Sequence, residues 1–425
     1  MDIFDYSTNR EEFARAAAVI PGGIYGHLGP ARGCHMPVSA YPFYASKAKG
    51  AHIRDSDGNK FIDHMSAYGT MICGYANNDI DDAALQACRN GDCTTLPSTL
   101  SIDLAELLVD TIHSAEWAIF AKNGSDAVSL AMMTARSATG RDKIIMYNGS
   151  YHGTHTWMRN AGDPGIAAAD VANTIYIDWN NLQQLEDAIA AHEGDIAALI
   201  ATPYMQYTFA DNVLPAPGYW NDVRSICTAH GIVLILDDIR TGWRLDLAGS
   251  DHYFGFEADL ICCGGALANG WNISALCGKD SLKNACSSVS YTGTYWHSAA
   301  PIAAAIATLT KLREHEDACG YMRMIGESLT SGLESISAQH GFHMVTTGEP
   351  CFFSIRLADD DNFVLHQEFI AECVKRGALF APHHNHFTNL AETMEDVDQT
   401  LIIANEAFSA VASQHPDMGL SLIHI

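Results

Sequence analysis

Between residues 78 and 315, hydrophobic and polar positions follow two patterns that alternate along the chain. Short, nearly continuous apolar runs predict strands, and apolar residues at helical spacing between them predict amphipathic helices. The predicted strands are EWAIFA (116–121), KIIMY (143–147), IAALIAT (196–202) and GIVLILD (231–237). The predicted helices are DIDDAALQACRN (79–90), SDAVSLAMMTARSA (125–138), NLQQLEDAIAAH (181–192) and NDVRSICTAH (221–230). This alternation predicts an α/β fold with a mostly parallel sheet covered by helices.

The two ends of the chain follow other patterns. Residues 10–18 predict a short helix, and residues 51–64 predict a hairpin around Asp57-Gly58. Beyond residue 320, a strand-like run (CFFSIRL) and two helix-like runs (LHQEFIAECVKRG and VDQTLIIANEAFSAVA) predict a small α+β domain. We therefore expect three parts. They are an N-terminal segment that joins the small domain (1–60), a large domain (61–315) and the C-terminal small domain (316–425).

Composition narrows the classes of function. A chain of 425 residues with 48% hydrophobic content can bury a sizeable core. Its formal net charge of −26 disfavours nucleic acid and anionic membranes as partners, because both attract clustered Lys and Arg. The first residues are acidic where a signal peptide is basic, and no apolar run approaches the roughly 20 residues of a membrane span. The 12 cysteines lie partly in apolar runs, which indicates buried thiols. We expect a cytoplasmic protein.

Two motifs place candidate chemistry at the ends of predicted strands. In KNGSDA (122–127), Gly124 lets the backbone approach a ligand, and the first N–H groups of the following helix favour an anion such as phosphate. Ser125 or Asp126 could instead simply cap that helix. The segment LILDDIRTGWR (234–244) delivers Asp237 and Asp238 to the carboxyl end of a buried strand, where open α/β sheets bind ligands. The alternative role for either acid is to cap a turn.

Two aromatic loops add weaker candidates. YNGSYHG (147–153) offers Tyr151 and His152 at the end of another predicted strand. YTGTYWH (291–297) precedes a predicted helix, and its Gly-Thr pair could hold an anion or could only turn the chain. The segments HGTH and HHNH lack acidic or cysteine partners at metal-site spacing, so we expect no metal.

The order of these motifs resembles the class III, fold-type I aminotransferases, which use pyridoxal 5′-phosphate (PLP). Within that family the chain is most similar to glutamate-1-semialdehyde aminomutase and the aminotransferases related to it. The resemblance also includes IPGGIYG, GAHIRDSDGNKFIDHMSAYG, ADLICCGGALANG and RGALFAP, and it covers nearly the whole chain. It implies a large PLP-binding domain with a seven-stranded, mostly parallel sheet. It also implies PLP or pyridoxamine 5′-phosphate as cofactor, and transfer of an amino group between a small amine and a carbonyl compound.

The same resemblance implies roles for individual residues. Gly124 and Ser125 match the backbone that binds the cofactor phosphate, and Tyr151 matches the aromatic ring that stacks on the pyridine. Asp237 matches the acid that pairs with the pyridine nitrogen and so makes the cofactor an electron sink. Ile239 matches the residue that packs on the opposite face of the ring.

Two further positions concern the partner subunit and the covalent anchor. Thr294 matches a residue that reaches the phosphate of a second subunit, which implies a homodimer with shared active sites. Gly265 stands where the family has the lysine that bonds to the cofactor aldehyde and then moves a proton. We therefore expect slow or absent transamination. Either the lysine was replaced deliberately in an otherwise complete site, which we favour, or the chain is a homologue that works without it.

The residues that would contact the substrate are less well defined by the sequence. Tyr25, His27 and Arg32 lie near the N-terminal Pro-Gly-Gly segment, where the aminomutase has a basic residue, and Arg32 could clamp a carboxylate. His152 and His297 are candidate substrate contacts, or bases in place of the lysine. These differences favour an aminotransferase over a strict aminomutase. A lysine-independent racemase or dehydratase, and a non-catalytic homologue that binds the cofactor, stay open.

Overall fold

The computed structural model describes residues 3–24, 40–208, 210–358 and 360–415. Contacts divide the chain into two compact units. The first unit contains residues 1–77, 207–212 and 320–425, and the second contains residues 78–206 and 213–319. The first unit is thus built from both ends of the chain.

The unit boundaries differ from the predicted domain boundaries. The prediction placed them after residues 60 and 315, whereas the units change after residues 77 and 319. Residues 61–77 belong with the first unit because β3 (Lys60–Asp63) pairs in parallel with β13 (Ala378–Leu379). A bridge between Gly50 and Tyr75 adds to this attachment. Such pairings join distant segments and leave no local signal in the pattern of apolar positions.

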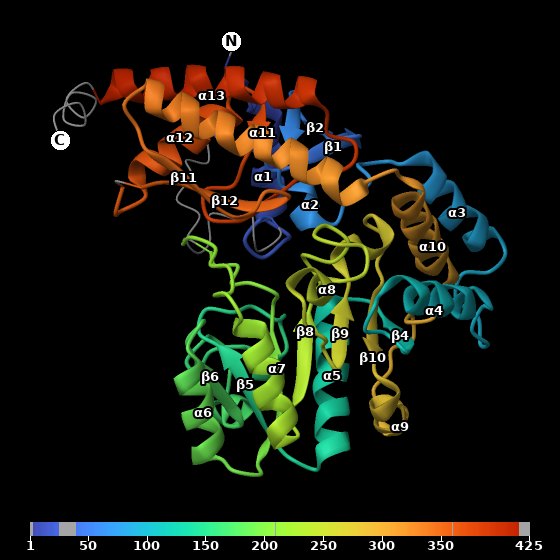
Figure 1. Ribbon diagram of the computed structural model, residues 1–425. Coiled ribbons are helices and arrows are strands. Elements are labelled where there is room, and N and C mark those ends of the chain that lie inside the picture. The colour runs from blue at the N-terminus through green and yellow to red at the C-terminus, as the bar shows by residue number, and fades with distance from the viewer. Residues whose placement is uncertain (1–2, 25–39, 209, 359, 416–425) are drawn as a thin grey trace. The chain divides into compact units, whose positions relative to one another are not determined.

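A seven-stranded sheet forms the centre of the second unit (Figure 1). Its strands are β4 (Trp117–Ala121), β5 (Lys143–Tyr147), β6 (Thr174–Ile177), β7 (Ile196–Ala201), β8 (Val233–Asp237), β9 (Leu260–Cys263) and β10 (Ser274–Gly278). They are ordered β4-β10-β9-β8-β7-β5-β6. β9, β8, β7, β5 and β6 pair in parallel, and only β10 runs antiparallel to its neighbours. The predicted α/β fold with a mostly parallel sheet is confirmed.

Helices pack against this sheet and against one another. They are α3 (Asn78–Arg89), α4 (Leu100–Thr111), α5 (Gly124–Thr139), α6 (Leu182–Ala191), α7 (Tyr219–His230), α8 (Ser250–Phe254), α9 (Asp280–Ser288) and α10 (Ala299–Glu314). α5 contacts β10, β9 and β7, while α6 contacts β6 and α7 contacts β8. The shared core includes Leu130 of α5, Ile200 of β7 and Ile235 of β8, all fully buried. This packing holds the ends of the central strands in fixed positions.

The described residues of the first unit form two small sheets and four long helices. Its helices are α1 (Ser7–Ala17), α2 (Ser66–Gly69), α11 (Ala318–Gln339), α12 (Val364–Val374) and α13 (Met394–Gln414), of which α2 is a single turn. Its strands are β1 (Ala45–Lys49), β2 (His52–Asp55), β3, β11 (Met344–Glu349), β12 (Phe352–Leu357), β13 and β14 (His386–Phe387). β2 and β3 form the predicted hairpin around Asp57-Gly58. The core lies where α12 and α13 meet, with the rings of Phe369 and Phe408 stacked 4.1 Å apart.

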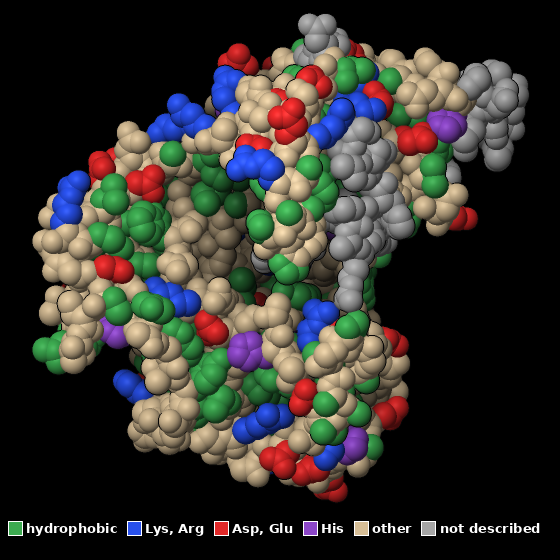
Figure 2. All heavy atoms as spheres, turned by 180° about the vertical axis from the view of Figure 1, so that it is seen from behind, with side chains coloured by type: hydrophobic (Ala, Val, Ile, Leu, Met, Phe, Trp, Pro, Cys, Tyr) green, Lys and Arg blue, Asp and Glu red, His purple; other side chains and the backbone are tan. Residues whose placement is uncertain are grey.

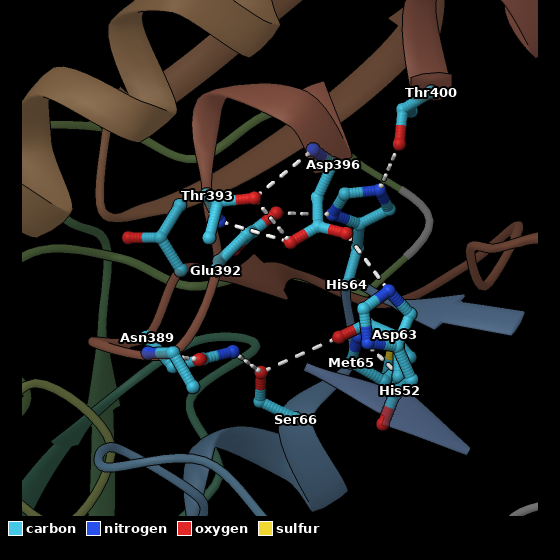
Figure 3. A network of polar contacts seen from close by, with 12 residues as sticks. His52, Asp63, His64, Met65, Ser66, Asn389, Glu392, Thr393, Asp396 and Thr400 are labelled. Carbon is cyan, nitrogen blue, oxygen red and sulfur yellow. Dashed lines mark hydrogen bonds and ion pairs between the residues drawn. The ribbon is translucent and has the colours of Figure 1, made fainter. Parts of the chain in front are cut away.

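A buried polar network crosses the first unit (Figure 3). His64 Nδ1 lies 3.0 Å from Glu392 Oε1, and its Nε2 lies 3.0 Å from Thr400 Oγ1. Nearby, His52 Nε2 lies 2.8 Å from Asp396 Oδ1. Burial alone would raise the pKa of Asp396, but hydrogen bonds, above all from His52, lower it to about 2. The network ties β2 and the end of β3 to the beginning of α13.

The same network holds a strained turn. Ser66, Ala67 and Tyr68 have left-handed backbone angles, with φ of 45°, 49° and 60°. Each such residue costs about 1–2 kcal/mol when it is not glycine. Asn389 Nδ2 donates a 3.0 Å hydrogen bond to Ser66 Oγ, so the turn is anchored to the segment before α13 (Figure 3).

The helices and the charged side chains on the surface agree with what the composition indicates about membranes and nucleic acid. Within the described ranges, no helix is long and apolar enough to cross a membrane. On the face in Figure 2, Lys and Arg side chains lie scattered among Asp and Glu. This face offers no single basic patch of the kind that binds a phosphate backbone.

Candidate active site

A cavity of about 170 Å³ lies in the second unit, beyond the carboxyl ends of β5, β7 and β8. Parallel strands bring these ends to one edge of the sheet, which is where α/β proteins bind ligands. The lining residues are Gly124, Ser125, Tyr151, His152, Gly153, Thr202, Asp237, Ile239 and Arg240. Three motifs that are far apart in the sequence therefore meet at one place.

The beginning of α5 forms one wall. Asn123 N–H donates a 2.8 Å hydrogen bond to Asp126 Oδ2, so Asp126 has the capping role. Ser125 Oγ accepts a 3.1 Å hydrogen bond from Thr154 N–H and lines the cavity. The first N–H groups of a helix have no acceptor within the helix and attract anions. Asp126 thus has the capping role, and an anion-binding role of Gly124 and Ser125 stays a prediction.

Two glycines let the loops approach closely. A Cβ on Gly124 would lie 2.6 Å from Ile239 Cδ1. A Cβ on Gly153 would lie 2.4 Å from Ser125 Oγ, and Gly153 also has a φ of +125°. Side chains at these positions would push the walls apart. Gly153 was not among the predicted site residues, although it ends the aromatic motif.

Asp237 and Asp238 face different surroundings. Asp237 ends β8 and lines the cavity, where its Oδ1 accepts a 3.2 Å hydrogen bond from Ile239 N–H. Asp238 turns away and accepts hydrogen bonds from Thr241 Oγ1 at 2.6 Å and from Ser250 N–H at 3.1 Å. Burial raises the pKa of Asp238 to about 7. Asp237 is therefore the acid that a ligand can reach, and Asp238 caps the turn.

His152 is the partner of Asp237. The ring is buried, and its Nδ1 lies 2.7 Å from Asp237 Oδ2. The other nitrogen, Nε2, is also buried and has no hydrogen-bond partner among the described residues. This contact orients the carboxylate toward the cavity. Any direct role of His152 as a base or substrate contact stays a prediction.

Tyr151 and Arg240 form the more open wall. Tyr151 is 40% exposed, so its ring is accessible to a planar ligand. The guanidinium carbon of Arg240 lies 5.5 Å from the centre of that ring. Arg240 was missed as a site residue. Its position directly after Ile239, in the same strand-end loop, is the signal that could have found it.

Gly265 lies next to the cavity. It begins a 3-10 turn after β9, and a Cβ on it would lie 2.3 Å from the carbonyl oxygen of Ile239, a lining residue. Its φ of +32° also disfavours side chains. The loop in this conformation is suited to glycine, and a lysine here requires the backbone to shift.

The Gly-Thr loop lies apart from the cavity lining. Thr294 is exposed, and its carbonyl oxygen lies 3.5 Å from Cys93 Sγ. His297 Nε2 lies 2.8 Å from the carbonyl oxygen of Thr94. The contact of Thr294 with a second subunit stays a prediction, as does a substrate role for His297.

The remaining predicted substrate residues, Tyr25, His27 and Arg32, lie outside the described residues. Among the residues that are described, no group of three or more His, Cys, Asp and Glu side chains is placed to hold a metal ion. In the two histidine-rich segments, His152 contacts Asp237, and His386 Nε2 accepts a 3.1 Å hydrogen bond from Ala381 N–H.

Comparison with known proteins identifies the family. The model of class III aminotransferases matches residues 35–411. The chain belongs to the class III aminotransferase family. This class III aminotransferase is 40% identical over 400 residues to the aminopentol aminotransferase of Sphingopyxis macrogoltabida, with 93% of each chain covered. It is 31% identical over 443 residues to glutamate-1-semialdehyde 2,1-aminomutase of Chloroflexus aggregans, covering 95% of this chain and 98% of the other.

A solved structure supports the same conclusion. The FumI protein of Sphingopyxis sp. MTA144, in its PLP internal aldimine form, is 39% identical and superimposes with a TM-score of 0.92. The match covers 96% of this chain and 97% of that one. The predicted family, fold type and enzyme class are confirmed. Identity to the aminotransferase exceeds identity to the aminomutase, and the PLP of FumI agrees with the predicted cofactor.

Proposed function

We propose that this class III aminotransferase binds PLP in the cavity and transfers an amino group between a small amine and a carbonyl acceptor, slowly because of Gly265. The observation that carries the proposal is Asp237. It is a buried acid that ends β8, is oriented by His152 and lines a cavity that the beginning of α5 also lines. No described residue other than His152 lies within ion-pair distance of its carboxylate, so a cationic ring nitrogen would complete the site.

The residues present fit PLP. The N–H groups of Gly124 and Ser125 would hold the phosphate, Tyr151 would cover one face of the pyridine and Ile239 the other. Gly124 supports this fit, because a Cβ there would close the gap to Ile239. PLP supplies an electron sink for the bonds of the carbon that bears the amino group.

Asp237 and His152 would together control the proton on the pyridine nitrogen. Asp237 would keep a proton on the pyridine nitrogen, because a buried carboxylate is stabilised by a cation beside it. The 2.7 Å contact between His152 Nδ1 and Asp237 Oδ2 would hold the carboxylate in place. This division makes Asp237 the cofactor-contacting acid and His152 its positioning residue.

Gly265 removes two functions from the site. A glycine has no amine to bond with the cofactor aldehyde, and it has no base to move a proton on the substrate. Cofactor binding then depends on the phosphate, ring and nitrogen contacts alone. We expect non-covalent binding and slow turnover.

The test compares the unmodified chain with Gly265→Lys and Gly265→Ala. Each protein is titrated with PLP, reduced with borohydride and weighed by mass spectrometry. We expect all three to bind PLP, and only Gly265→Lys to gain a covalent adduct and faster amine transfer. Gly265→Ala is the matched control, because it adds the same Cβ beside the Ile239 carbonyl without an amine.

Two results would contradict this proposal in different ways. Absence of PLP binding in the unmodified chain would overturn the function. A stable lysine adduct in the unmodified chain would overturn the role of Gly265. If Gly265→Lys binds PLP but gains neither adduct nor transfer, a lysine-independent enzyme or a non-catalytic homologue becomes the better description.

We also propose a homodimer in which Thr294 reaches the phosphate bound by the partner. Leu96, Ile102 and Tyr295 are 76%, 58% and 66% exposed. The hydrogen bond between His297 and the Thr94 carbonyl joins the loops that carry Leu96 and Tyr295. Large apolar side chains gathered on a surface are typical of protein interfaces. Sedimentation should give twice the chain mass, and Thr294→Ala should weaken PLP binding.

A cytoplasmic location is part of the same proposal. It is supported by the cysteines, since those of the described residues are all free thiols and most of them are buried.

A further inference from the structure

Arg240 brings a positive charge to the cavity that the proposed cofactor contacts do not use. It lines the cavity and lies over the Tyr151 ring, at 5.5 Å from the guanidinium carbon to the ring centre. It follows Ile239 on the loop after β8, so its backbone is fixed by the same strand that places Asp237.

The guanidinium has no anionic partner in the described part of the chain. Other arginines are paired with carboxylates within 3 Å, namely Arg159 with Asp163, Arg224 with Asp259, Arg313 with Asp110, and Arg356 with Asp211. For Arg240, only the contact with the Tyr151 face is found, a weak substitute for a carboxylate. Burial lowers the pKa of Arg240, which indicates that its charge is poorly solvated where it stands.

The nearest acid does not satisfy this charge. Asp237 raises the pKa of Arg240 through space, but its carboxylate is held by His152 Nδ1 and by Ile239 N–H. An arginine keeps its proton in proteins, so an unpaired guanidinium in a cavity favours an anionic ligand.

We propose that Arg240 binds a carboxylate of the substrate, so that the amine or its carbonyl acceptor is an amino acid or oxo acid. This inference rests on the proposed function. Within that function, the phosphate is assigned to the beginning of α5 and the ring nitrogen to Asp237, which leaves Arg240 for the substrate. A planar guanidinium holds a carboxylate through two parallel hydrogen bonds, and it also offsets the repulsion that the net charge of −26 exerts on an anion.

The experiment uses the PLP-loaded chain and two pairs of amines that differ only in a carboxylate and a methyl group. The pairs are alanine with 2-aminopropane, and 3-aminobutanoate with 2-aminobutane. Binding is followed by the absorbance of the cofactor. We expect the carboxylate member of at least one pair to bind about 10- to 100-fold more tightly, as for a charge-assisted hydrogen bond.

Variants assign this preference to Arg240. Arg240→Gln should abolish it and retain PLP affinity, and Arg240→Lys should keep only part of it. Arg159→Gln is the matched control, since it removes one charge from the same unit at a surface ion pair with Asp163. It should leave the preference unchanged. A competition experiment on the unmodified chain tests the same preference. Butanoate should compete with 3-aminobutanoate for binding, and butanamide should not.

The outcomes separate this inference from the proposed function. If PLP does not bind to the unmodified chain, the proposed function fails first. If PLP binds but neither pair shows a preference, or Arg240→Gln keeps it, the inference fails alone. If Arg240→Gln loses PLP affinity while the preference persists, Arg240 belongs to the cofactor and the inference is overturned.

Discussion

At the residue scale, Asp237 and Asp238 are neighbours with opposite environments. The backbone rotates by about half a turn per residue along a strand, so one side chain enters the cavity and the other enters the turn. The sequence placed both acids at the end of a buried strand. Only the contacts with His152 and with Ser250 distinguish the ligand-facing acid from the turn cap.

Gly153→Ala tests whether the cavity requires the close approach of the Gly153 backbone to Ser125. The new methyl group would meet Ser125 Oγ at 2.4 Å and Met158 Sδ at 3.0 Å, so the cavity wall that carries Ser125 must shift. We expect PLP affinity to fall about tenfold or more and the unfolding free energy to fall by about 2–4 kcal/mol, from the left-handed backbone and the overpacking together.

The control for this change is Gly162→Ala. Gly162 also has a positive φ, +91°, but a Cβ there meets nothing within 4 Å. It should cost about 1–2 kcal/mol of unfolding free energy and leave PLP affinity intact. Similar losses of PLP affinity in both variants would show that backbone strain, and not the contact with Ser125, explains the effect.

At the scale of elements, several strongly patterned segments between residues 116 and 237 were predicted, and weakly patterned segments there and before them were missed. The strands β5, β7 and β8 are almost wholly buried, so their apolar runs are continuous. The edge strand β6 and the helix α4 were not predicted. Three of the four residues in β6 are only half-buried, and α4 keeps Ile102 and Val109 exposed, so the apolar periodicity of both is blurred.

His64→Phe tests the polar network between β3 and α13. Phenylalanine keeps the stacking of His64 on Phe380, with ring centres 4.5 Å apart, but removes the partner of Glu392. Both side chains of the pair are 1% exposed, so Glu392 would be a buried carboxylate without compensation. We expect a loss of about 3–5 kcal/mol in the unfolding free energy measured with urea.

The single variant Glu392→Leu and the double variant His64→Phe/Glu392→Leu complete this test. Replacing both partners with apolar groups removes the uncompensated charge, so much of the loss should be recovered. If the losses of the two single variants simply add, the pair does not act as a unit, and the interpretation of the network is wrong.

At the scale of the whole molecule, stability should fall as the pH decreases from about 6.5 to 4. Burial lowers the pKa of His366 to about 4 and holds the pKa of His386 well below its ordinary value. The folded protein keeps both rings neutral, while the unfolded chain binds protons below about pH 6.5. Their stabilising contribution is therefore complete above that pH and is lost as the pH falls.

Urea unfolding at pH 7 and pH 4.5 measures this effect. His366 should contribute about 2–3 kcal/mol to the difference, so His366→Gln should reduce the difference by that amount. His343→Gln is the control, since this histidine belongs to the same unit and is exposed. An equal reduction in both variants would contradict a specific role for the buried ring.

The sequence by itself determined the family, the α/β class and the motifs that meet at the cavity. These depend on local signals, namely apolar periodicity and short motifs at strand ends, and the topology of a parallel sheet brings such ends to one edge. It also predicted that Gly265 stands where the family has a lysine.

Only the tertiary structure decided which side chains face one another. It assigned Asp237 to the cavity and Asp238 to the turn, made His152 the partner of Asp237, and brought Arg240 to the cavity wall. It also attached residues 61–77 to the first unit. The physical reason is common to all of these. Each depends on hydrogen bonds, burial or pairing between segments that are distant in the chain, which no local pattern of residue types encodes.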